Sequence, residues 1–385
     1  MAPELLPVPP DKGGAIERWI RDAARLLARR GHDVHVVSRD HGDGARERQI
    51  DGVTYHFVRI PAALDRGQPA VIARGAWYFN RAAAVVARLA PQIVHHHSRP
   101  ASVYALRRRA PRARHVLSLH SMRYGWSCVY AGADRSIFRA AFRACARVLP
   151  VSDFIKRHAL EHYPELEGKI ATLYNGVDGC LFRPRASGDP VAAAHAGDRA
   201  ILYVGRVEER KGVNVLLDAF ERMRAGGGTA RLRIVGPHSY WSPSPSSFYA
   251  SFAERCRLLG GVELCDPTYV DEELAAIYRS ATVSVVPSVF PEALGLTSLE
   301  AQASGVPVIV SNAGGLPETV NPQESGLVVE HSNADALASA MLTLLGDPIR
   351  TREMGHRARA WAMDRFSWDR IASQLEAVYA EVALT

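Results

Sequence analysis

The chain has 385 residues, more than one hydrophobic core usually organises, so its length favours two domains. Hydrophobic residues make up 47% and charged residues 23%, with no low-complexity tract, which excludes a fibrous or largely disordered chain. The net charge of +7 comes mainly from arginines spread along helical segments, which favours solvated helix faces over a nucleic-acid or membrane surface.

The cysteines and the first residues bear on the cellular compartment. Five scattered cysteines, none spaced as C-x-x-C, indicate reduced thiols rather than a disulfide framework or a zinc site. No run reaches the roughly 18 to 20 apolar residues of a membrane span, and residues 1–10 lack the basic flank and apolar core of a signal peptide. We therefore expect a cytoplasmic protein.

The first half alternates short apolar runs, typical of buried parallel strands, with helical segments. The expected strands are 34–38, 54–58, 93–97, 116–120, 148–151 and 171–174. An amphipathic helix is expected over 15–30, with Gly31 as its stop. This pattern predicts a doubly wound, Rossmann-like α/β domain over 1–182.

The opening strand of such a domain is hard to find. Residues 1–10 are rich in proline, which cannot donate to a central strand ladder, and the turn Gly13-Gly14 follows almost directly. We expect the first strand to be missing or truncated. Two explanations stay open: a true start upstream of Met1, or a sheet that lacks its founding strand.

The second half repeats the alternation and predicts another Rossmann-like domain over 183–364. Its expected strands are 200–205, 232–235, 262–264, 283–287, 306–310 and 326–329, separated by helices at 213–224, 272–280 and 297–304. The stretch 182–198, which contains prolines and glycine, is the predicted linker. A final helical stretch over 349–384 is interrupted near Ser367, and its end, 365–385, is expected to pack on the N-terminal domain.

Two carboxylates flank the start of one predicted helix. Glu292 lies in the loop after a strand, and Glu300 lies about one turn into the helix that begins near Leu296. A helix start directs free backbone N–H groups into a small volume and suits an anion such as a sugar diphosphate. Glu292 would then bind sugar hydroxyls and Glu300 a ribose hydroxyl. The alternative is a capping acid and a solvated helical glutamate.

Several spaced motifs resemble those of glycosyltransferase family 4, whose members have the GT-B fold of two Rossmann-like domains facing a cleft. The resemblance covers nearly the whole chain. It rests on the E-x7-E pair, the segment 302–309, Gly314-Gly315-Leu316-Pro317-Glu318, 201–206 followed by 209–212, 174–178 and 149–152. It implies a hexosyltransferase that retains the anomeric configuration and holds a nucleotide sugar mainly in the C-terminal half.

The resemblance and the chemistry together give the donor site. Arg206 and Lys211 would stabilise the charge of the departing diphosphate, although basic residues near a helix start are also common on surfaces. Gly13-Gly14 would let the backbone approach the donor, and His120, after a strand, matches the histidine that reaches the donor sugar. The expected donor-binding residues are Gly13, Gly14, Gly205, Arg206, Lys211, Glu292, Ala293, Leu294, Gly295, Leu296, Thr297 and Glu300, with His120, Arg206, Lys211 and Glu292 as the catalytic group.

Neither a metal nor a cofactor is expected. Consecutive side chains on a strand point to opposite faces, so His95, His96 and His97 cannot converge on one ion. The chain also lacks Asp-x-Asp, with which many sugar transferases hold a divalent cation. The nucleotide sugar is a substrate, and Arg206 with Lys211 replaces the metal.

The mechanism expected from this site is front-face attack, because no residue is free to act as a nucleophile for double displacement. Two other classes stay open: a nucleotide-sugar epimerase of related fold, and a non-catalytic sugar-binding protein. Neither would release nucleoside diphosphate only when an acceptor is added.

The acceptor is a small molecule whose binding groups are expected in the N-terminal domain. The candidates are Lys12, His97, Arg123, Tyr124, Trp126 and Asn175. The segment 7–17 resembles transferases that glycosylate 2-deoxystreptamine in aminoglycoside antibiotic biosynthesis, with UDP-N-acetylglucosamine or UDP-glucose as donor. A GDP-mannose or UDP-sugar enzyme with a lipid or glycan acceptor is the alternative. No nucleic-acid partner is expected, and the oligomeric state stays open.

Overall fold

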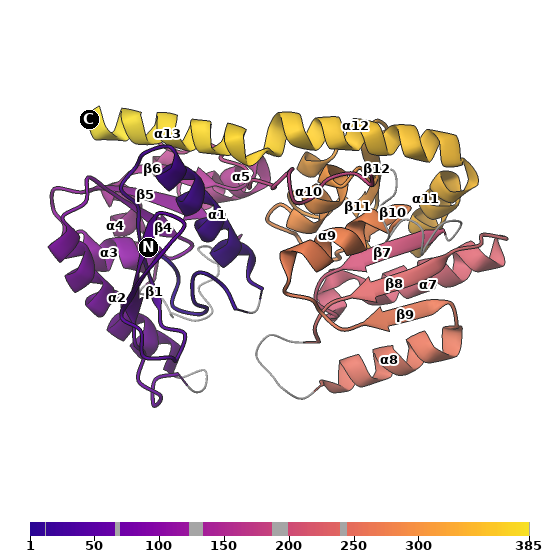
Figure 1. The fold of residues 1–385 in the computed structure, drawn as a ribbon, viewed down its shortest axis with the longest axis horizontal. Coiled ribbons are helices and arrows are strands. Elements are labelled where there is room, and N and C mark those ends of the chain that lie inside the picture. Colours follow the sequence, from indigo (N-terminus) through magenta and orange to yellow (C-terminus); the bar gives the residue numbers. More distant parts are fainter. Residues whose placement is uncertain (12, 66–69, 123–133, 187–198, 239–244, 385) are drawn as a thin grey trace. The chain divides into compact units, whose positions relative to one another are not determined.

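The computed structural model describes residues 1–11, 13–65, 70–122, 134–186, 199–238 and 245–384. The chain divides into two compact units, Met1–Asn175 with Trp368–Thr385, and Gly176–Ser367 (Figure 1). These boundaries differ from the expected ones at 182 and 364. The backbone N–H of Val177 donates to Phe366 (2.7 Å), and Arg359 binds the carbonyl of Phe182 (2.7 Å), so residues 176–182 pack with the second unit.

The strands of the N-terminal unit form two three-stranded sheets, ordered β1-β3-β2 and β4-β5-β6. They are β1 (His35–Arg39), β2 (Glu47–Ile50), β3 (Val53–Val58), β4 (Ile93–His97), β5 (Arg114–Leu119) and β6 (Cys145–Pro150). The unpredicted strand β2 pairs antiparallel with β3 and is exposed along its length, so it carries no apolar pattern. The strand expected at 171–174 is absent. That segment only makes backbone bonds such as Leu173 N–H to Pro150 O (2.9 Å).

Residues 1–10 form no strand but connect the two sheets. The N–H of Ala2 donates to Val37 O on β1 (2.9 Å), and the amino group of Met1 donates to His95 O on β4 (2.8 Å). The N–H of Val8 donates to Ser38 Oγ (2.8 Å). The segment therefore occupies the gap where a further strand would join β1 to β4, and its prolines are unsuited to a continuous ladder.

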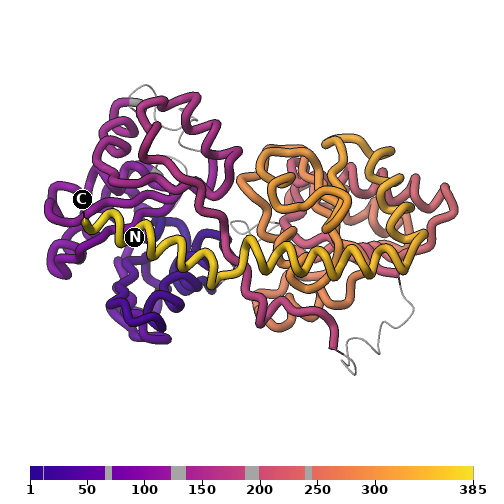
Figure 2. Tube along the Cα trace, turned by 90° about the horizontal axis from the view of Figure 1, so that it is seen from above, coloured from indigo at the N-terminus to yellow at the C-terminus, as the bar shows by residue number. Residues whose placement is uncertain are grey.

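Helices cover these strands on two separate cores. The helices are α1 (Ala15–Arg29), α2 (Ala70–Leu89), α3 (Pro100–Leu106), α4 (Asp134–Ala144), α5 (Asp153–His162), the short turn η3 (Pro164–Leu166) and α13 (Trp368–Leu384). One core joins α1 and α13 to the strands through Trp19, Tyr55 and Ile371, and the other packs Tyr78 of α2 and Leu106 of α3. The C-terminal helix α13 thus belongs to the first unit, where it contacts α1 and β6 (Figure 2).

The C-terminal unit contains one parallel sheet in the order β12-β11-β10-β7-β8-β9. Its strands are β7 (Ala200–Val204), β8 (Arg231–Val235), β9 (Val262–Cys265), β10 (Val283–Val286), β11 (Val308–Ser311) and β12 (Gly326–Val329). The central strands β10 and β11 are buried at every position, which explains why valine and isoleucine predominate in them, with Ser284 and Ser311 as the buried polar exceptions.

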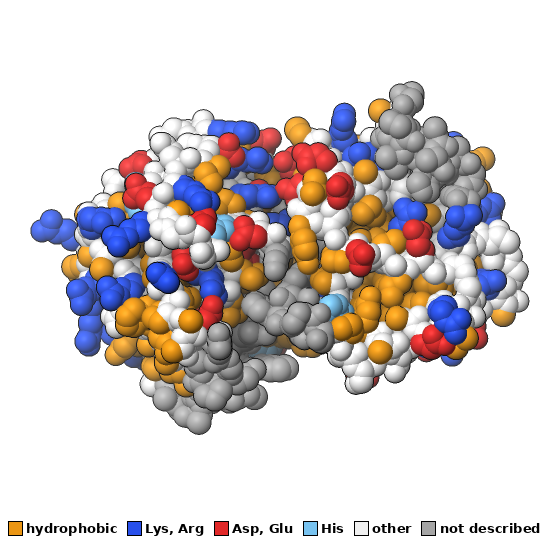
Figure 3. All heavy atoms as spheres, turned by 60° about the horizontal axis from the view of Figure 1, so that its bottom comes forward, with side chains coloured by type: hydrophobic (Ala, Val, Ile, Leu, Met, Phe, Trp, Pro, Cys, Tyr) orange, Lys and Arg blue, Asp and Glu red, His pale blue; other side chains and the backbone are white. Residues whose placement is uncertain are grey.

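Helices and short turns complete this unit. They are η4 (Glu209–Lys211), α7 (Val213–Ala225), α8 (Ser247–Leu259), α9 (Asp271–Arg279), α10 (Leu296–Ala303), η5 (Leu316–Thr319), α11 (Ala334–Gly346) and α12 (Pro348–Phe366). Figure 3 shows acidic and basic side chains interspersed over this unit, whereas basic side chains gather at one end of the N-terminal unit. None of the described helices is both long enough and apolar enough to cross a membrane.

Candidate functional site

The loop between β10 and α10 is fixed by contacts with the loop after β11. Gly295 precedes α10 with a φ of 108°, and a Cβ there would lie 2.4 Å from Leu316 Cδ2. No side chain caps the helix, so its first N–H groups are not satisfied by a cap. The expected helix start at Leu296 is confirmed, and it offers backbone donors to an anion.

The backbone of Glu292 makes hydrogen bonds on both sides with the segment 313–315. The N–H of Gly315 donates to Glu292 O (2.8 Å), and the N–H of Glu292 donates to Ala313 O (3.3 Å). Gly314 has a φ of 66°, and a Cβ at this position would lie 2.3 Å from Glu292 O. A glycine at position 314 is therefore needed for the close approach of the two loops.

The carboxylate of Glu292 lies in a largely buried, hydrogen-bonded position. Lys211 Nζ donates to Glu292 Oε1 (2.5 Å), and Ser288 Oγ donates to the same oxygen (2.7 Å). Burial alone would raise the pKa of Glu292, but the Lys211 ammonium and the two hydrogen bonds outweigh it and lower the pKa below its ordinary value. Glu292 is therefore ionised at neutral pH and acts as a hydrogen-bond acceptor.

Lys211 reaches Glu292 because its turn is pressed against the β10 loop. Gly212 has a φ of 72°, and a Cβ on it would lie 1.8 Å from Pro287 O. The N–H of Val289 donates to Arg210 O (3.1 Å) across the same contact. Two segments about eighty residues apart thus present their charged groups at one place, at the carboxyl ends of β7 and β10.

Arg206 and Glu300 have other partners in this structure. Arg206 Nη1 donates to Glu208 Oε1 (2.5 Å) within the loop after β7. Glu300 is 3% exposed, and its Oε2 accepts a hydrogen bond from Tyr278 of α9 (2.9 Å). The structure therefore joins Lys211 and Glu292 directly, whereas the roles of Arg206 and Glu300 in binding a donor stay predictions.

The Gly13-Gly14 turn of the N-terminal unit carries an acidic group that the sequence did not single out. Gly14 has a φ of 108° at the start of α1, and a Cβ on it would lie 2.5 Å from Glu17 Oε2. Burial raises the pKa of Glu17 to about 7, although its own backbone N–H and Arg99 act in the opposite direction. A carboxyl group that titrates near neutrality therefore lies beside the Gly13-Gly14 turn, which is predicted to approach the donor.

His120 and His97 lie together at the carboxyl ends of β5 and β4. His97 Nδ1 and His120 Nε2 are 3.0 Å apart. His97 is only 4% exposed, and its role in binding the acceptor stays a prediction.

The three consecutive histidines alternate between faces, as strand geometry requires. His95 and His97 stack with ring centroids 4.4 Å apart, whereas His96 bonds Ser102 Oγ (2.7 Å) and His115 Nδ1 (3.0 Å) on the other face. Among the residues that the structure describes, no group of three or more His, Cys, Asp or Glu side chains could hold a metal ion.

Of the remaining acceptor candidates, the structure describes Asn175. Asn175 is 8% exposed, and its Oδ1 has no hydrogen-bond partner within the described part of the chain. Four candidates, Lys12, Arg123, Tyr124 and Trp126, lie outside the described residues.

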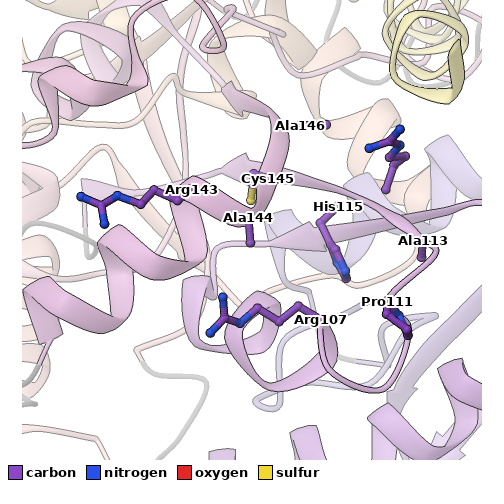
Figure 4. A pocket seen from close by; sticks show the side chains of 9 residues that line it. Arg107, Pro111, Ala113, His115, Arg143, Ala144, Cys145 and Ala146 are labelled. Carbon is purple, nitrogen blue, oxygen red and sulfur yellow. The ribbon is translucent and has the colours of Figure 1, made fainter. Parts of the chain in front are cut away.

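A shallow pocket of about 350 Å³ lies at the opposite, amino ends of β5 and β6 (Figure 4). It is lined mainly by residues of basic or small side chain, including Arg107, Arg114, His115, Arg143 and Cys145. This pocket belongs to the N-terminal unit, whereas Lys211 and Glu292 belong to the C-terminal unit, and it lies at the end of its sheet opposite to the one where doubly wound sheets bind ligands.

Comparison with known proteins supports the assignment of both halves. Residues 13–179 match the family described as Glycosyltransferase Family 4, and residues 189–361 match the family described as Glycosyl transferases group 1. Over nearly its whole length the chain is similar to Spore coat protein SA of Bacillus subtilis (strain 168), with 27% identity covering 98% of each chain.

The chain is also similar to two proteins that are named as sugar-metabolising enzymes. A GDP-mannose-dependent alpha-(1-6)-phosphatidylinositol monomannoside mannosyltransferase of Mycolicibacterium smegmatis is 30% identical over 94% of this chain and 93% of the relative. The solved structure of sucrose-phosphate synthase from Thermosynechococcus elongatus superposes with a TM-score of 0.82, at 24% identity and over 99% and 96% of the two chains.

Proposed function

Because the chain belongs to the GT-B glycosyltransferases of group 1 and family 4, we propose that it transfers a hexose or N-acetylhexosamine from a nucleoside diphosphate sugar with retention at the anomeric carbon. The observation that carries this proposal is the contact between Lys211 and Glu292 beside the uncapped start of α10. An ionised acceptor for sugar hydroxyls, a cation and free backbone donors are the groups that this substrate requires.

The proposed chemistry needs no protein nucleophile. The acceptor hydroxyl attacks the face of the sugar that the diphosphate is leaving, and a departing phosphate oxygen takes the hydroxyl proton. Lys211 stabilises the negative charge that develops on the diphosphate, together with Arg206 once its guanidinium reaches the phosphate. Glu292 accepts hydrogen bonds from the sugar hydroxyls and keeps the anomeric carbon in place. The leaving group is stabilised by these side chains rather than by a divalent cation.

Two donor and acceptor pairs follow from different observations. The resemblance of residues 7–17 favours UDP-N-acetylglucosamine or UDP-glucose with 2-deoxystreptamine as acceptor. The name of the Mycolicibacterium relative favours GDP-mannose as donor and a glycolipid acceptor such as phosphatidylinositol monomannoside. The first pair is our primary proposal, and the second is the alternative.

A panel experiment separates these possibilities. The purified full chain is incubated with UDP-N-acetylglucosamine, UDP-glucose or GDP-mannose, and with 2-deoxystreptamine or phosphatidylinositol monomannoside in detergent. The expected result is release of nucleoside diphosphate only in the presence of acceptor, unchanged by EDTA, and a product whose anomeric coupling constant matches that of the donor sugar. Inversion would contradict the retaining mechanism. Activity only with GDP-mannose and the lipid would replace the primary pair by the alternative.

A further inference from the structure

The ring of His120 contacts the ring of His97, a residue that the sequence analysis assigned to the acceptor site. His97 Nδ1 lies 3.0 Å from His120 Nε2, and the backbone N–H of His120 donates to Ser98 Oγ (3.2 Å). Ser98 directly follows β4, the strand that ends with His97, so the end of β4 contacts both the ring and the backbone of His120. Within the described residues, Nε2 is the His120 ring nitrogen that contacts His97, and Nδ1 is the one left for a ligand.

The His97 ring is itself held from several sides. It stacks on His95 with centroids 4.4 Å apart and lies 5.0 Å from the Trp19 ring of α1. His95 is fixed in turn by Tyr379 of α13 (2.6 Å) and by Ser118 Oγ of β5 (2.8 Å). A ring packed in this way cannot rotate to exchange partners, so its nitrogen is a fixed point for His120.

The two imidazoles share a single proton at their contact. Burial lowers the pKa of His120 to about 3, and burial with the neighbouring His95 and His120 holds the pKa of His97 well below its ordinary value. Both rings are therefore neutral near pH 7, so one donates at this contact and the other accepts. In a neutral imidazole the direction of this hydrogen bond decides the state of the other nitrogen: His120 Nδ1 carries the proton when His97 donates and is bare when His97 accepts.

On the basis of the proposed transfer reaction, we propose that His97 is a positioning residue that holds His120 in one ring orientation and one tautomer, with Nδ1 presented to the donor sugar. A sugar hydroxyl can donate or accept, so an imidazole free to flip between tautomers would satisfy it in two geometries. A fixed tautomer selects one of them and places the sugar for reaction.

The test combines three variants with a direct readout of the ring nitrogens. In full-length protein labelled with ¹⁵N-histidine, long-range ¹H–¹⁵N spectra distinguish protonated from bare ring nitrogens, and His120→Asn identifies the His120 signals. His97→Leu removes the hydrogen bond at similar volume. His97→Asn keeps an amide near the position of Nδ1. His96→Leu is the matched control, because His96 is equally buried on the same strand but bonds Ser102 and His115 on the opposite face.

We expect wild type and His97→Asn to show one tautomer of His120, with kcat/KM for the donor within about threefold of each other. In His97→Leu, the ¹⁵N chemical shifts of both His120 ring nitrogens should move to values averaged between the two tautomers. The kcat/KM of this variant should fall roughly tenfold, which is the effect of losing one positioning hydrogen bond. His96→Leu should lower the melting temperature but leave the His120 signals and kcat/KM unchanged.

The inference is overturned if His120 keeps a single tautomer in His97→Leu, or if His96→Leu disturbs it equally. The ring-nitrogen signals do not depend on turnover. If wild-type protein transfers no sugar at all, the proposed function fails, while the spectra still decide whether His97 fixes the His120 ring.

Discussion

Replacing Lys211 by methionine removes the cation from Glu292 while keeping most of the side-chain volume. The Lys211 and Glu292 side chains are 23% and 15% exposed, so the remaining carboxylate would keep Ser288 as its hydrogen-bond donor in a poorly hydrated position. Two charges about 4 Å apart interact by about 4 kcal/mol at an effective dielectric constant of 20. Partial exposure reduces this value, and we expect a loss of about 2 kcal/mol in the free energy of unfolding at pH 7.

The same change should act on turnover and on the pH dependence of stability. Loss of a fixed cation at the departing diphosphate should lower kcat/KM by a factor of about 10². In wild type the lowered pKa of Glu292 contributes stability above the ordinary pKa of 4.5, and this contribution is lost as the pH falls further. Without Lys211, burial dominates and raises the pKa, so the variant should gain relative stability as the carboxyl is protonated.

The assays are urea unfolding between pH 4 and 8 and donor-dependent release of nucleoside diphosphate. Arg222→Met is the control, since Arg222 lies on the following helix α7 and pairs with Asp335 rather than with a group of the site. It should leave kcat/KM within about threefold of wild type. A double-mutant cycle with Glu292→Gln should give a coupling energy of about 1 to 2 kcal/mol. Additive effects of the two substitutions on stability, or unchanged kcat/KM in Lys211→Met, would refute the reasoning.

Three other substitutions test separate parts of the structure. Glu292→Gln should lower kcat by about 10², because the amide lacks the charge that binds the sugar hydroxyls. The Kd of nucleoside diphosphate, measured by calorimetry, should change less than about threefold, because the groups that bind the diphosphate stay in place. Unchanged turnover would remove Glu292 from the site. Gly314→Ala should lower the free energy of unfolding by more than about 2 kcal/mol and reduce turnover by displacing Glu292. Gly227 also has a left-handed backbone but has open space around it, so Gly227→Ala should lower the free energy of unfolding by only about 1 kcal/mol. Equal losses in thermal unfolding would contradict the close approach at Gly314. Glu17→Gln should raise the free energy of unfolding in urea by up to about 3 kcal/mol at pH 8 and little at pH 4.5. The pKa of Glu17 is raised from 4.5 to about 7, so ionisation of its carboxyl destabilises the wild-type fold as the pH rises through that interval. A variant that is less stable than wild type at pH 8 would show that the carboxylate is stabilised instead.

The strands and the helix start beside the site followed directly from local sequence. The runs at β7, β10 and β11 are apolar because both faces of these strands are buried, and Gly295 before Leu296 marks the beginning of α10. Such features depend on neighbours within one element, so a pattern of residue types is enough to identify them.

Features that depend on distant contacts were missed or misplaced. Nothing around residue 288 indicates that its hydroxyl shares an oxygen of Glu292 with Lys211, and the acidic Glu17 beside Gly14 only becomes notable once its burial is known. The end of β4 marked His97 as a candidate for the acceptor site, but its contacts with His120 and with Trp19 of α1 could not be found from the sequence. The exposed strand β2 has no apolar alternation, so only pairing with β3 defines it.

The central claim is that Lys211, Arg206, Glu292 and the first N–H groups of α10 together hold one sugar-linked diphosphate. A crystal structure of the full chain with a non-hydrolysable UDP-sugar, or with a GDP-sugar if the donor panel selects one, tests it most directly. We expect phosphate oxygens within hydrogen-bond distance of Lys211 Nζ and the Arg206 guanidinium, with a sugar hydroxyl on Glu292. A nucleotide bound elsewhere, with the Lys211–Glu292 contact unchanged and remote from it, would contradict the claim.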